Sequence, residues 1–150
     1  MELKDILNEE TILMDLKANS KEDALLELAE KLLEKDYILN VEDFLVDIYA
    51  REEKGQTGLG NYIAIPHGIS EAVREIGVAI GVSKNEIPWE TLDGNGVKII
   101  ILFAVGPQKE GENNHLKLLS LFARKLGNDE VIEKLLNAST SSEVKDAFIK

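Results

Sequence analysis

Hydrophobic residues recur at three- and four-residue intervals in the first third of the chain, which is the spacing of one face of an α-helix. Two helices are predicted there, one beginning after Ser20 and one after Asn40, because both residue types are favoured N-caps. Gly55 is a favourable terminator for the second helix and opens a glycine-rich connection that reaches residue 60. Ahead of both helices, the short apolar-rich stretch at residues 10–16 predicts a first strand.

The middle third has continuous apolar runs in place of the helical spacing. Residues 76–82 and 97–105 are rich in β-branched side chains, which is typical of strands buried on both faces. A shorter run at residues 62–65 precedes them, and Pro88 and Asp93-Gly94 indicate turns. This region therefore supplies most of the strands of a sheet.

The last third returns to the helical spacing. Three helices are predicted, at residues 114–126, 128–136 and 140–148, and the spacing of Thr140 and Glu143 is that of a capping box. Helices on both sides of a group of strands predict an α/β fold in which a mixed sheet is flanked by helices on both faces. The chain shows no repeat or linker, so residues 1–150 are expected to form a single domain.

Composition excludes several kinds of chemistry. The chain has 150 residues, of which 44% are hydrophobic and 30% charged, as is ordinary for a globular domain. It contains no cysteine, which excludes disulfides, thiolate metal sites and a cysteine nucleophile.

Charge and hydropathy bear on location and partners. The N-terminal segment lacks the basic start and apolar run of a signal peptide, and the longest apolar stretch, residues 99–105, is far shorter than the ~20 residues that span a bilayer. We therefore expect a cytoplasmic protein that is not embedded in a membrane. The formal net charge of −11 would repel nucleic acid and attract a partner with a basic face, although from charge alone solubility is the simpler explanation.

Two polar residues fall on helical stripes that are otherwise apolar. Arg51 lies three residues after Ile48, in the last turn of its predicted helix, where it either complements the helix dipole or holds an anion with two donors. His115 lies in the first turn of a predicted helix, seven residues before Phe122. It is either a hydrogen-bonded core histidine or a group placed where helix N–H donors favour phosphate.

His67 stands at a strand end, in the sequence Ile65-Pro66-His67-Gly68. Pro66 cannot donate to a β-ladder, so it belongs at a strand end or sheet edge. Gly68 leaves room for another backbone or a ligand beside the imidazole. His67 is thus either an exposed turn residue without a role or a histidine presented for chemistry.

Other reaction classes find little support. The two histidines do not have zinc-motif spacing, and no metal is predicted. The glycine-rich segment lacks the GK[ST] of a P-loop, and no GxSxG elbow is present.

Taken together, residues 51–68, REEKGQTGLGNYIAIPHG, closely resemble the hallmark of the fructose/mannitol class of enzyme IIA. This domain (type 2 EIIA) belongs to the bacterial phosphoenolpyruvate-dependent sugar phosphotransferase system. Residues 115–119 and 122–126 are similar to the second signature of the family. The similarity covers nearly the whole chain, and Tyr62, where the family pattern has a smaller residue, is its one local departure.

The resemblance implies a mixed sheet with helices on both sides and a role for each site residue. His67 would accept a phosphoryl group from the phosphohistidine of HPr and pass it to a cysteine of enzyme IIB (EIIB). Arg51 and His115 would flank it as catalytic and phosphate-binding residues, without a cofactor, and Thr57 is assigned to phosphate binding with them. A neutral imidazole is nucleophilic near pH 7, and the P–N bond it forms is labile, as a relay requires.

Three other functions remain open at this point. A regulatory protein of the nitrogen-related branch would be phosphorylated at the same histidine, but would act by binding other proteins. A sensor domain of a larger regulator is a further alternative, against which Met1 and the lack of a fused region argue mildly. A degenerate, inactive domain is the last, and the intact Arg51, His67 and His115 argue against it.

Overall fold

A five-stranded mixed sheet forms the centre of the computed structural model, which describes residues 2–109 and 112–150. The strand order is β1-β4-β5-β3-β2. The central strands β4 and β5 are antiparallel to each other. Strand β1 pairs in parallel with β4, β3 pairs in parallel with β5, and β2 forms an antiparallel hairpin with β3. The strands are β1 (Ile12–Leu13), β2 (Gly58–Gly60), β3 (Ile63–Ala64), β4 (Gly77–Ile87) and β5 (Val97–Ala104).

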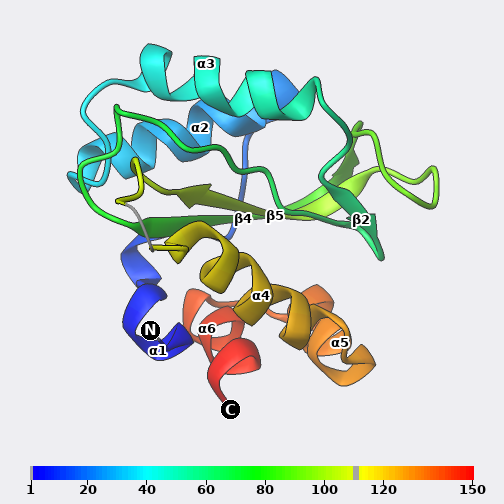
Figure 1. Cartoon of the computed structure of the whole chain (residues 1–150). Helices are drawn as coiled ribbons and strands as arrows, with labels where there is room; N and C mark the ends of the chain where they lie inside the picture. Colours follow the sequence, from blue (N-terminus) through cyan, green and yellow to red (C-terminus); the bar gives the residue numbers. More distant parts are fainter. Residues whose placement is uncertain (1, 110–111) are drawn as a thin grey trace.

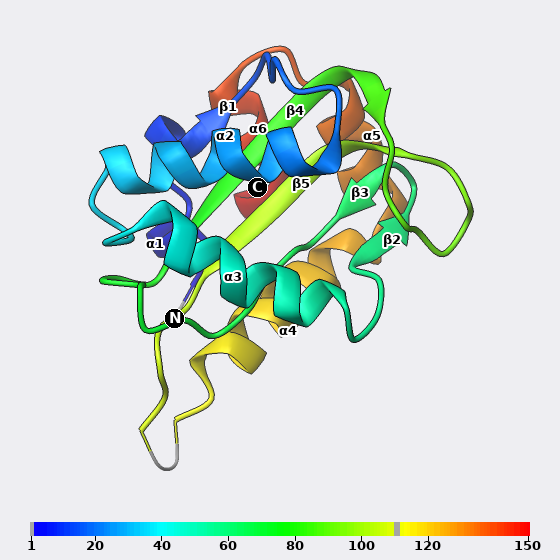
Figure 2. The same ribbon diagram turned by 90° about the horizontal axis from the view of Figure 1, so that it is seen from above.

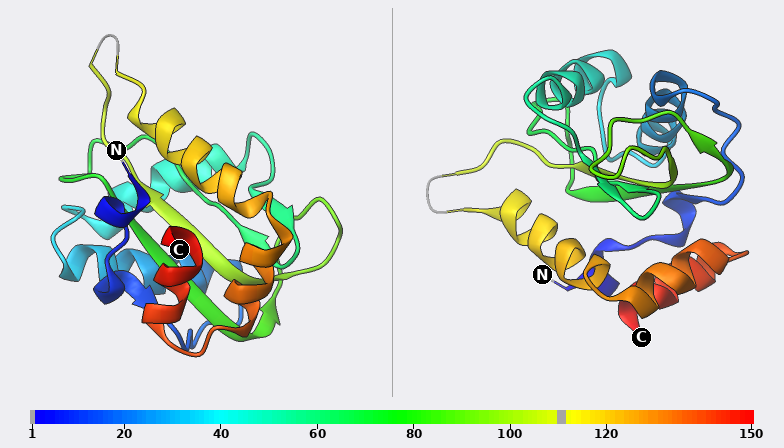
Figure 3. Two further views of the ribbon diagram at one scale, coloured as in Figure 1. Left: turned by 90° about the horizontal axis from the view of Figure 1, so that it is seen from below. Right: turned by 90° about the vertical axis from the view of Figure 1, so that its right-hand side faces the viewer.

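Helices cover both faces of the sheet, as the sequence predicted (Figure 1). One face carries α2 and α3, and the other carries α1, α4, α5 and α6, which Figure 3 shows most clearly in its right-hand view. The helices are α1 (Leu3–Ile6), α2 (Lys21–Glu34), α3 (Val41–Glu52), α4 (Asn114–Leu126), α5 (Asp129–Asn137) and α6 (Ser141–Ile149).

Strand β5 explains why the middle of the chain is continuously apolar. Its side chains alternate between the two faces, so Ile101 and Phe103 enter the core beneath α4–α6 while Ile100 and Leu102 enter the core beneath α2 and α3. A strand buried on both faces has no polar side, and the prediction of buried strands is confirmed.

The predicted N-caps hold the helix starts. The side chains of Ser20 and Asn40 accept hydrogen bonds from the backbone N–H groups of Asp23 and Asp43. Asn128 caps α5 in the same way, and the backbone N–H of Glu143 donates to Thr140 Oγ1 at 3.1 Å. Four of the five predicted helices begin at such a cap, α4 begins without a side-chain cap, and all five begin within one residue of the predicted position.

Four boundaries differ from the prediction. The first strand is only two residues long, because residues 9–11 form a 3₁₀ turn capped by Asn8, and β4 runs on to Ile87. The end of the glycine-rich connection is strand β2, and the short helix α1 was not predicted. Apart from the local cap at Asn8, pairing or packing with another segment decides these structures, and the spacing of hydrophobic residues does not show it.

The β2–β3 turn accommodates Tyr62 at a strained position. Asn61 and Tyr62 both have left-handed backbones, with φ of 55° and 66°. The Tyr62 carbonyl accepts hydrogen bonds from the N–H groups of Lys98 and Ile99, and the Lys98 Nζ lies 5.0 Å from the centroid of the Tyr62 ring. These contacts hold a residue type that rarely adopts this conformation.

The chain after β3 continues along the edge of β5 and lies between the two helical layers. The Pro66 carbonyl accepts from Phe103 N–H at 3.1 Å, and Ser70 N–H donates to the Val105 carbonyl at 3.0 Å. In Figure 2, α3 and α4 both run along this side of the sheet. Residues 65–70 are therefore held by the sheet and flanked by α3 above and α4 below.

Candidate functional site

His67 is fixed in one tautomer by the backbone beside it. Its Nδ1 lies 2.8 Å from the carbonyl oxygen of Ile65. A carbonyl can only accept, so Nδ1 carries the proton and Nε2 keeps its lone pair. The ring centroid lies 6.4 Å from that of Phe103, which packs against it from the sheet. The imidazole is thus half-buried, with one nitrogen anchored and the other available as a nucleophile.

Burial lowers the pKa of His67 below its ordinary value of about 6.5, because charge is poorly solvated there. The positive charge of Arg51 lowers the pKa further, while the hydrogen bond to Ile65 and the charge of Glu52 raise it in part. The result is an imidazole that remains neutral, and hence nucleophilic, at pH 7.

Arg51 lies in the last turn of α3, as predicted, and its guanidinium is anchored at one point. Its Nη1 donates to the carbonyl of Gly55 at 2.9 Å. A guanidinium has five N–H donors, so this contact leaves others for a ligand. The guanidinium therefore contacts the loop after α3 and faces the same cavity as His67.

His115 is the second residue of α4 and also faces this cavity. Its Nδ1 is buried and has no hydrogen-bond partner among the described residues. A buried polar atom without a partner is costly, and such atoms are commonly satisfied by a ligand or a water. The absence of a partner argues against a core histidine satisfied by the backbone.

The cavity has a volume of about 460 Å³ and brings together the three residues that the sequence singled out: Arg51, His67 and His115. Phe103 and Leu119 supply apolar wall, and Lys54 adds a cation that the sequence reasoning missed. Lys54 lies in the turn after α3, where its N–H donates to the Arg51 carbonyl at 3.1 Å, so its nearness to Arg51 in the sequence is the signal that could have found it. Two lysine or arginine cations beside a neutral imidazole suit an anion such as a phosphoryl group.

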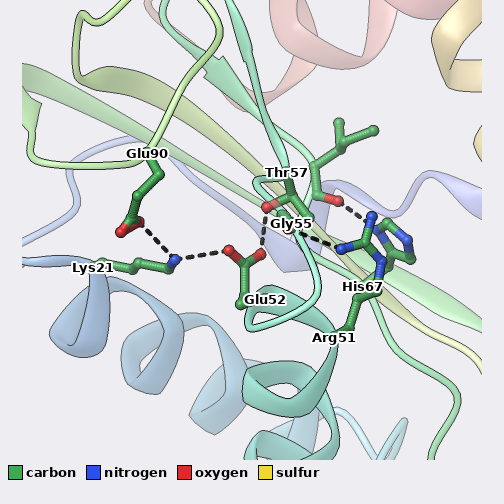
Figure 4. A network of polar contacts seen from close by, with 8 residues as sticks. Lys21, Arg51, Glu52, Gly55, Thr57, His67 and Glu90 are labelled. Carbon is green, nitrogen blue, oxygen red and sulfur yellow. Dashed lines mark hydrogen bonds and ion pairs between the residues drawn. The ribbon is translucent and has the colours of Figure 1, made fainter.

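Thr57 lies outside this cavity. Its side chain is 2% exposed, and its hydroxyl donates to the carboxylate of Glu52. Glu52 in turn accepts from Lys21 Nζ at 2.7 Å, and Lys21 also pairs with Glu90 at 2.9 Å (Figure 4). The Thr57 hydroxyl therefore contacts an ion-pair network and does not line the cavity in which an anion would bind.

Sequence reasoning missed Lys21 and Glu52, although a signal was present. Glu52 lies four residues after Ile48 on the apolar stripe of α3, and Lys21 lies four residues before Leu25 on that of α2. Each is a charge on a buried face, the same feature that singled out Arg51.

Residues 2–109 and 112–150 contain no group of three or more histidine, aspartate or glutamate side chains arranged to hold a metal ion. No helix in this part of the chain has both the length and the apolar character needed to cross a membrane.

Comparisons with known proteins match the chain along nearly its full length. A family model described as "Phosphoenolpyruvate-dependent sugar phosphotransferase system, EIIA 2" matches residues 5–150. The mannitol-specific phosphotransferase enzyme IIA component of Bacillus subtilis is 33% identical over 95% of this chain and 96% of its own length. The 2-O-alpha-mannosyl-D-glycerate-specific EIIABC component of Escherichia coli is 30% identical over 99% of this chain, which spans only 22% of that protein.

Solved structures share the fold. The nitrogen regulatory protein IIA-Ntr of Neisseria meningitidis superposes with a TM-score of 0.85, at 29% identity over 96% of this chain and 97% of the other. The mannitol IIA of Escherichia coli superposes with a TM-score of 0.79, at 25% identity over 95% of this chain and 98% of the other. The relatives thus include both sugar-specific and nitrogen-regulatory proteins.

Proposed function

The chain belongs to the EIIA 2 family of the phosphoenolpyruvate-dependent sugar phosphotransferase system, and on this basis we propose that it is a phosphocarrier in which His67 holds the phosphoryl group. One observation carries the assignment. The Ile65 carbonyl holds the Nδ1 proton of His67, which leaves Nε2 as the nucleophile in a cavity with cationic side chains.

The proposed reaction consists of two transfers. Nε2 of His67 attacks the phosphorus of the phosphohistidine of HPr, a P–N bond forms as the donor's P–N bond breaks, and the donor imidazole leaves. Nδ1 keeps its proton, and Ile65 keeps its hydrogen bond to it. A thiolate of enzyme IIB then attacks the same phosphorus, and His67 leaves as a neutral imidazole once Nε2 is released.

Arg51 and His115 are proposed to bind the phosphoryl oxygens during both transfers. Arg51 has N–H donors beyond the one that contacts Gly55, and His115 Nδ1, beside the cavity, has no hydrogen-bond partner among residues 2–109 and 112–150. Charge on the equatorial oxygens needs positioned donors, and in this site they come from side chains. Lys54 adds a further positive charge.

The two proposed partners are HPr as donor and enzyme IIB as acceptor, and we expect the reactions to take place in the cytoplasm. The net charge of −11 would steer a donor with a basic face toward the chain. A regulatory role of the nitrogen-related type is a second candidate, favoured by the superposition on IIA-Ntr. Both roles use the same phosphohistidine and differ in what binds next.

Phosphorylation in vitro tests the proposal. Incubation with phosphoenolpyruvate, enzyme I and HPr should add one acid-labile phosphoryl group, and ³¹P NMR should place it on Nε2 of His67. His67→Gln should remain unmodified while keeping its fold. Phosphate on His115 or on a serine would refute the assignment, and transfer to an added enzyme IIB would favour transport over regulation.

A further inference from the structure

A buried ion pair lies behind the cavity, at the junction of α2, α3 and the β2–β3 hairpin (Figure 4). Lys21 Nζ and Glu52 Oε2 are 2.7 Å apart, and their side chains are only 14% and 5% exposed. Glu52 also accepts a hydrogen bond from the Thr57 hydroxyl. We refer to Lys21, Glu52 and Thr57 as the Glu52 network.

The burial of this pair is unusual within residues 2–109 and 112–150. Every other ion pair there has at least one side chain more than 30% exposed. Removing two charges from water costs several kcal/mol per ion, and packed apolar side chains often serve stability equally well. A buried pair beside a reactive site therefore calls for an explanation other than stability.

The network is joined to the imidazole by two backbone hydrogen bonds. The Thr57 carbonyl accepts from Ile65 N–H at 2.9 Å, and the Ile65 carbonyl lies 2.8 Å from His67 Nδ1. Ile65, whose carbonyl fixes the tautomer, is thus held through its own N–H by the residue whose hydroxyl Glu52 binds.

The same network holds the anchor of Arg51. Glu52 and Thr57 close the loop at residues 52–57, and the carbonyl of Gly55 in this loop accepts from Arg51 Nη1 at 2.9 Å. Both functional side chains therefore donate to carbonyls of residues linked to Glu52, Gly55 through the loop and Ile65 through Thr57.

We propose that the Glu52 network positions the His67 imidazole and the Arg51 guanidinium for phosphoryl transfer. The inference rests on the proposed function, since it assigns positioning residues to that reaction. It gives Thr57 an indirect role, through the backbone, in place of direct contact with the phosphoryl group. The negative charge of Glu52 also offsets part of the lowering of the His67 pKa by burial and by Arg51.

A purely structural network would dock α2 against α3 and leave the reaction unchanged. Thr57→Val separates the two roles, because it removes the hydroxyl at nearly constant volume. Thr11→Val is the matched control: Thr11 is equally buried, and its hydroxyl donates to the Val78 carbonyl at 2.7 Å, outside the residues that line the cavity. Thr57→Ser keeps the hydroxyl and should restore function.

We expect Thr57→Val to accept phosphate from phospho-HPr roughly tenfold or more slowly at saturating donor, because small errors in alignment are costly to the transfer step. The KM for phospho-HPr should be unchanged. Thr57→Ser should transfer within about threefold of the unmodified chain. Thr11→Val should lower the urea midpoint but leave the transfer rate unchanged.

A second readout needs no phosphoryl donor. ¹⁵N NMR of His67 should show a single Nδ1–H tautomer in the unmodified chain and in Thr11→Val, and a mixture of tautomers in Thr57→Val. Should Thr57→Val fail to fold, Lys21→Met serves with Lys35→Met as its control, since Lys35 pairs with Glu10 at the surface. The same change in tautomer is expected for Lys21→Met only.

A folded Thr57→Val or Lys21→Met chain with an unchanged tautomer and an unchanged rate would overturn the inference. Failure of the proposed function has a different signature: the unmodified chain would not be phosphorylated at His67. The tautomer measurement would then still decide whether the network orients the imidazole.

Discussion

The close approach of Gly68 to α3 provides a test of whether this glycine sets the distance between α3 and the segment that carries His67. A Cβ at Gly68 would lie 2.8 Å from the carbonyl oxygen of Asp47 and 3.2 Å from its carbonyl carbon. These are helix backbone atoms, which cannot move aside as a flexible side chain can. The glycine thus leaves room for the backbone of α3, one of the two possibilities that the sequence left open.

The perturbation Gly68→Ala has a size that follows from these distances. Ordinary van der Waals contact begins at 3.4 Å, so α3 and residues 65–70 must separate by about 0.6 Å. Overpacking of this kind costs about 1–3 kcal/mol of unfolding free energy. Arg51 lies one turn beyond Asp47, so the separation also moves its guanidinium away from His67, and we expect transfer to slow by about tenfold to a hundredfold.

Urea unfolding and the rate of phosphoryl transfer from phospho-HPr measure the two effects. Gly127→Ala is the control, because a Cβ there lies 3.6 Å from the Ala123 carbonyl oxygen and meets no closer atom. It should leave transfer unchanged and raise stability by at most about 1 kcal/mol. A Gly68→Ala chain with full stability and full activity would refute the reasoning. Loss of transfer at full stability would mean that Gly68 makes room for the phosphoryl group and does not set the position of α3.

Three further predictions concern the cavity. Arg51→Lys keeps the charge but loses the fork, so stopped-flow transfer assays should show a barrier raised by about 2.7–4 kcal/mol; a rate equal to that of the unmodified chain would leave Arg51 only a helix-end role. His115→Ala should still be phosphorylated at His67 but pass the phosphoryl group to enzyme IIB much more slowly. Urea unfolding should show a loss of stability below about 1 kcal/mol. Full transfer together with a large loss of stability would make His115 a structural residue. Because the pKa of His67 is lowered in the folded chain, an NMR titration should find its midpoint below about 6.5. The contribution of the neutral ring to the free energy of unfolding should be complete above about pH 6.5, fall as the pH drops from there to the folded pKa, and level off below it. The variant His67→Gln should abolish this pH dependence.

The sequence predicted the site residues because each interrupts a local pattern. Arg51 and His115 occupy apolar stripes, and His67 follows a strand, so their positions could be seen without a structure. Their shared cavity is a tertiary feature that the structure supplies. Thr57 shows the limit of such reasoning, since the partner of its hydroxyl is decided by the turn after α3 and not by its neighbours in the sequence.

The same distinction applies to the fold. Helix starts were predicted well because a cap and its bonded N–H lie three residues apart. Strand β1 was predicted too long because its extent depends on pairing with β4, in which Ile12 is opposite Ile80. Local spacing contains no record of a partner so far along the chain.

The three site residues that the sequence singled out come from different layers. Arg51 belongs to α3 above the sheet, His67 follows β3 at the edge of β5, and His115 belongs to α4 below the sheet. Their joining requires the parallel pairing of β3 with β5, in which Ile63 is opposite Ile99, and then the docking of α4. Contacts this distant in sequence carry a cost of loop closure and form more slowly than local ones. A nascent chain that ends before α4 contains His67 but lacks His115. We therefore expect the onset of phosphoryl acceptance during refolding to coincide with global folding. Phosphoryl acceptance, if it occurs at His67 as proposed, should then report that the domain has assembled completely.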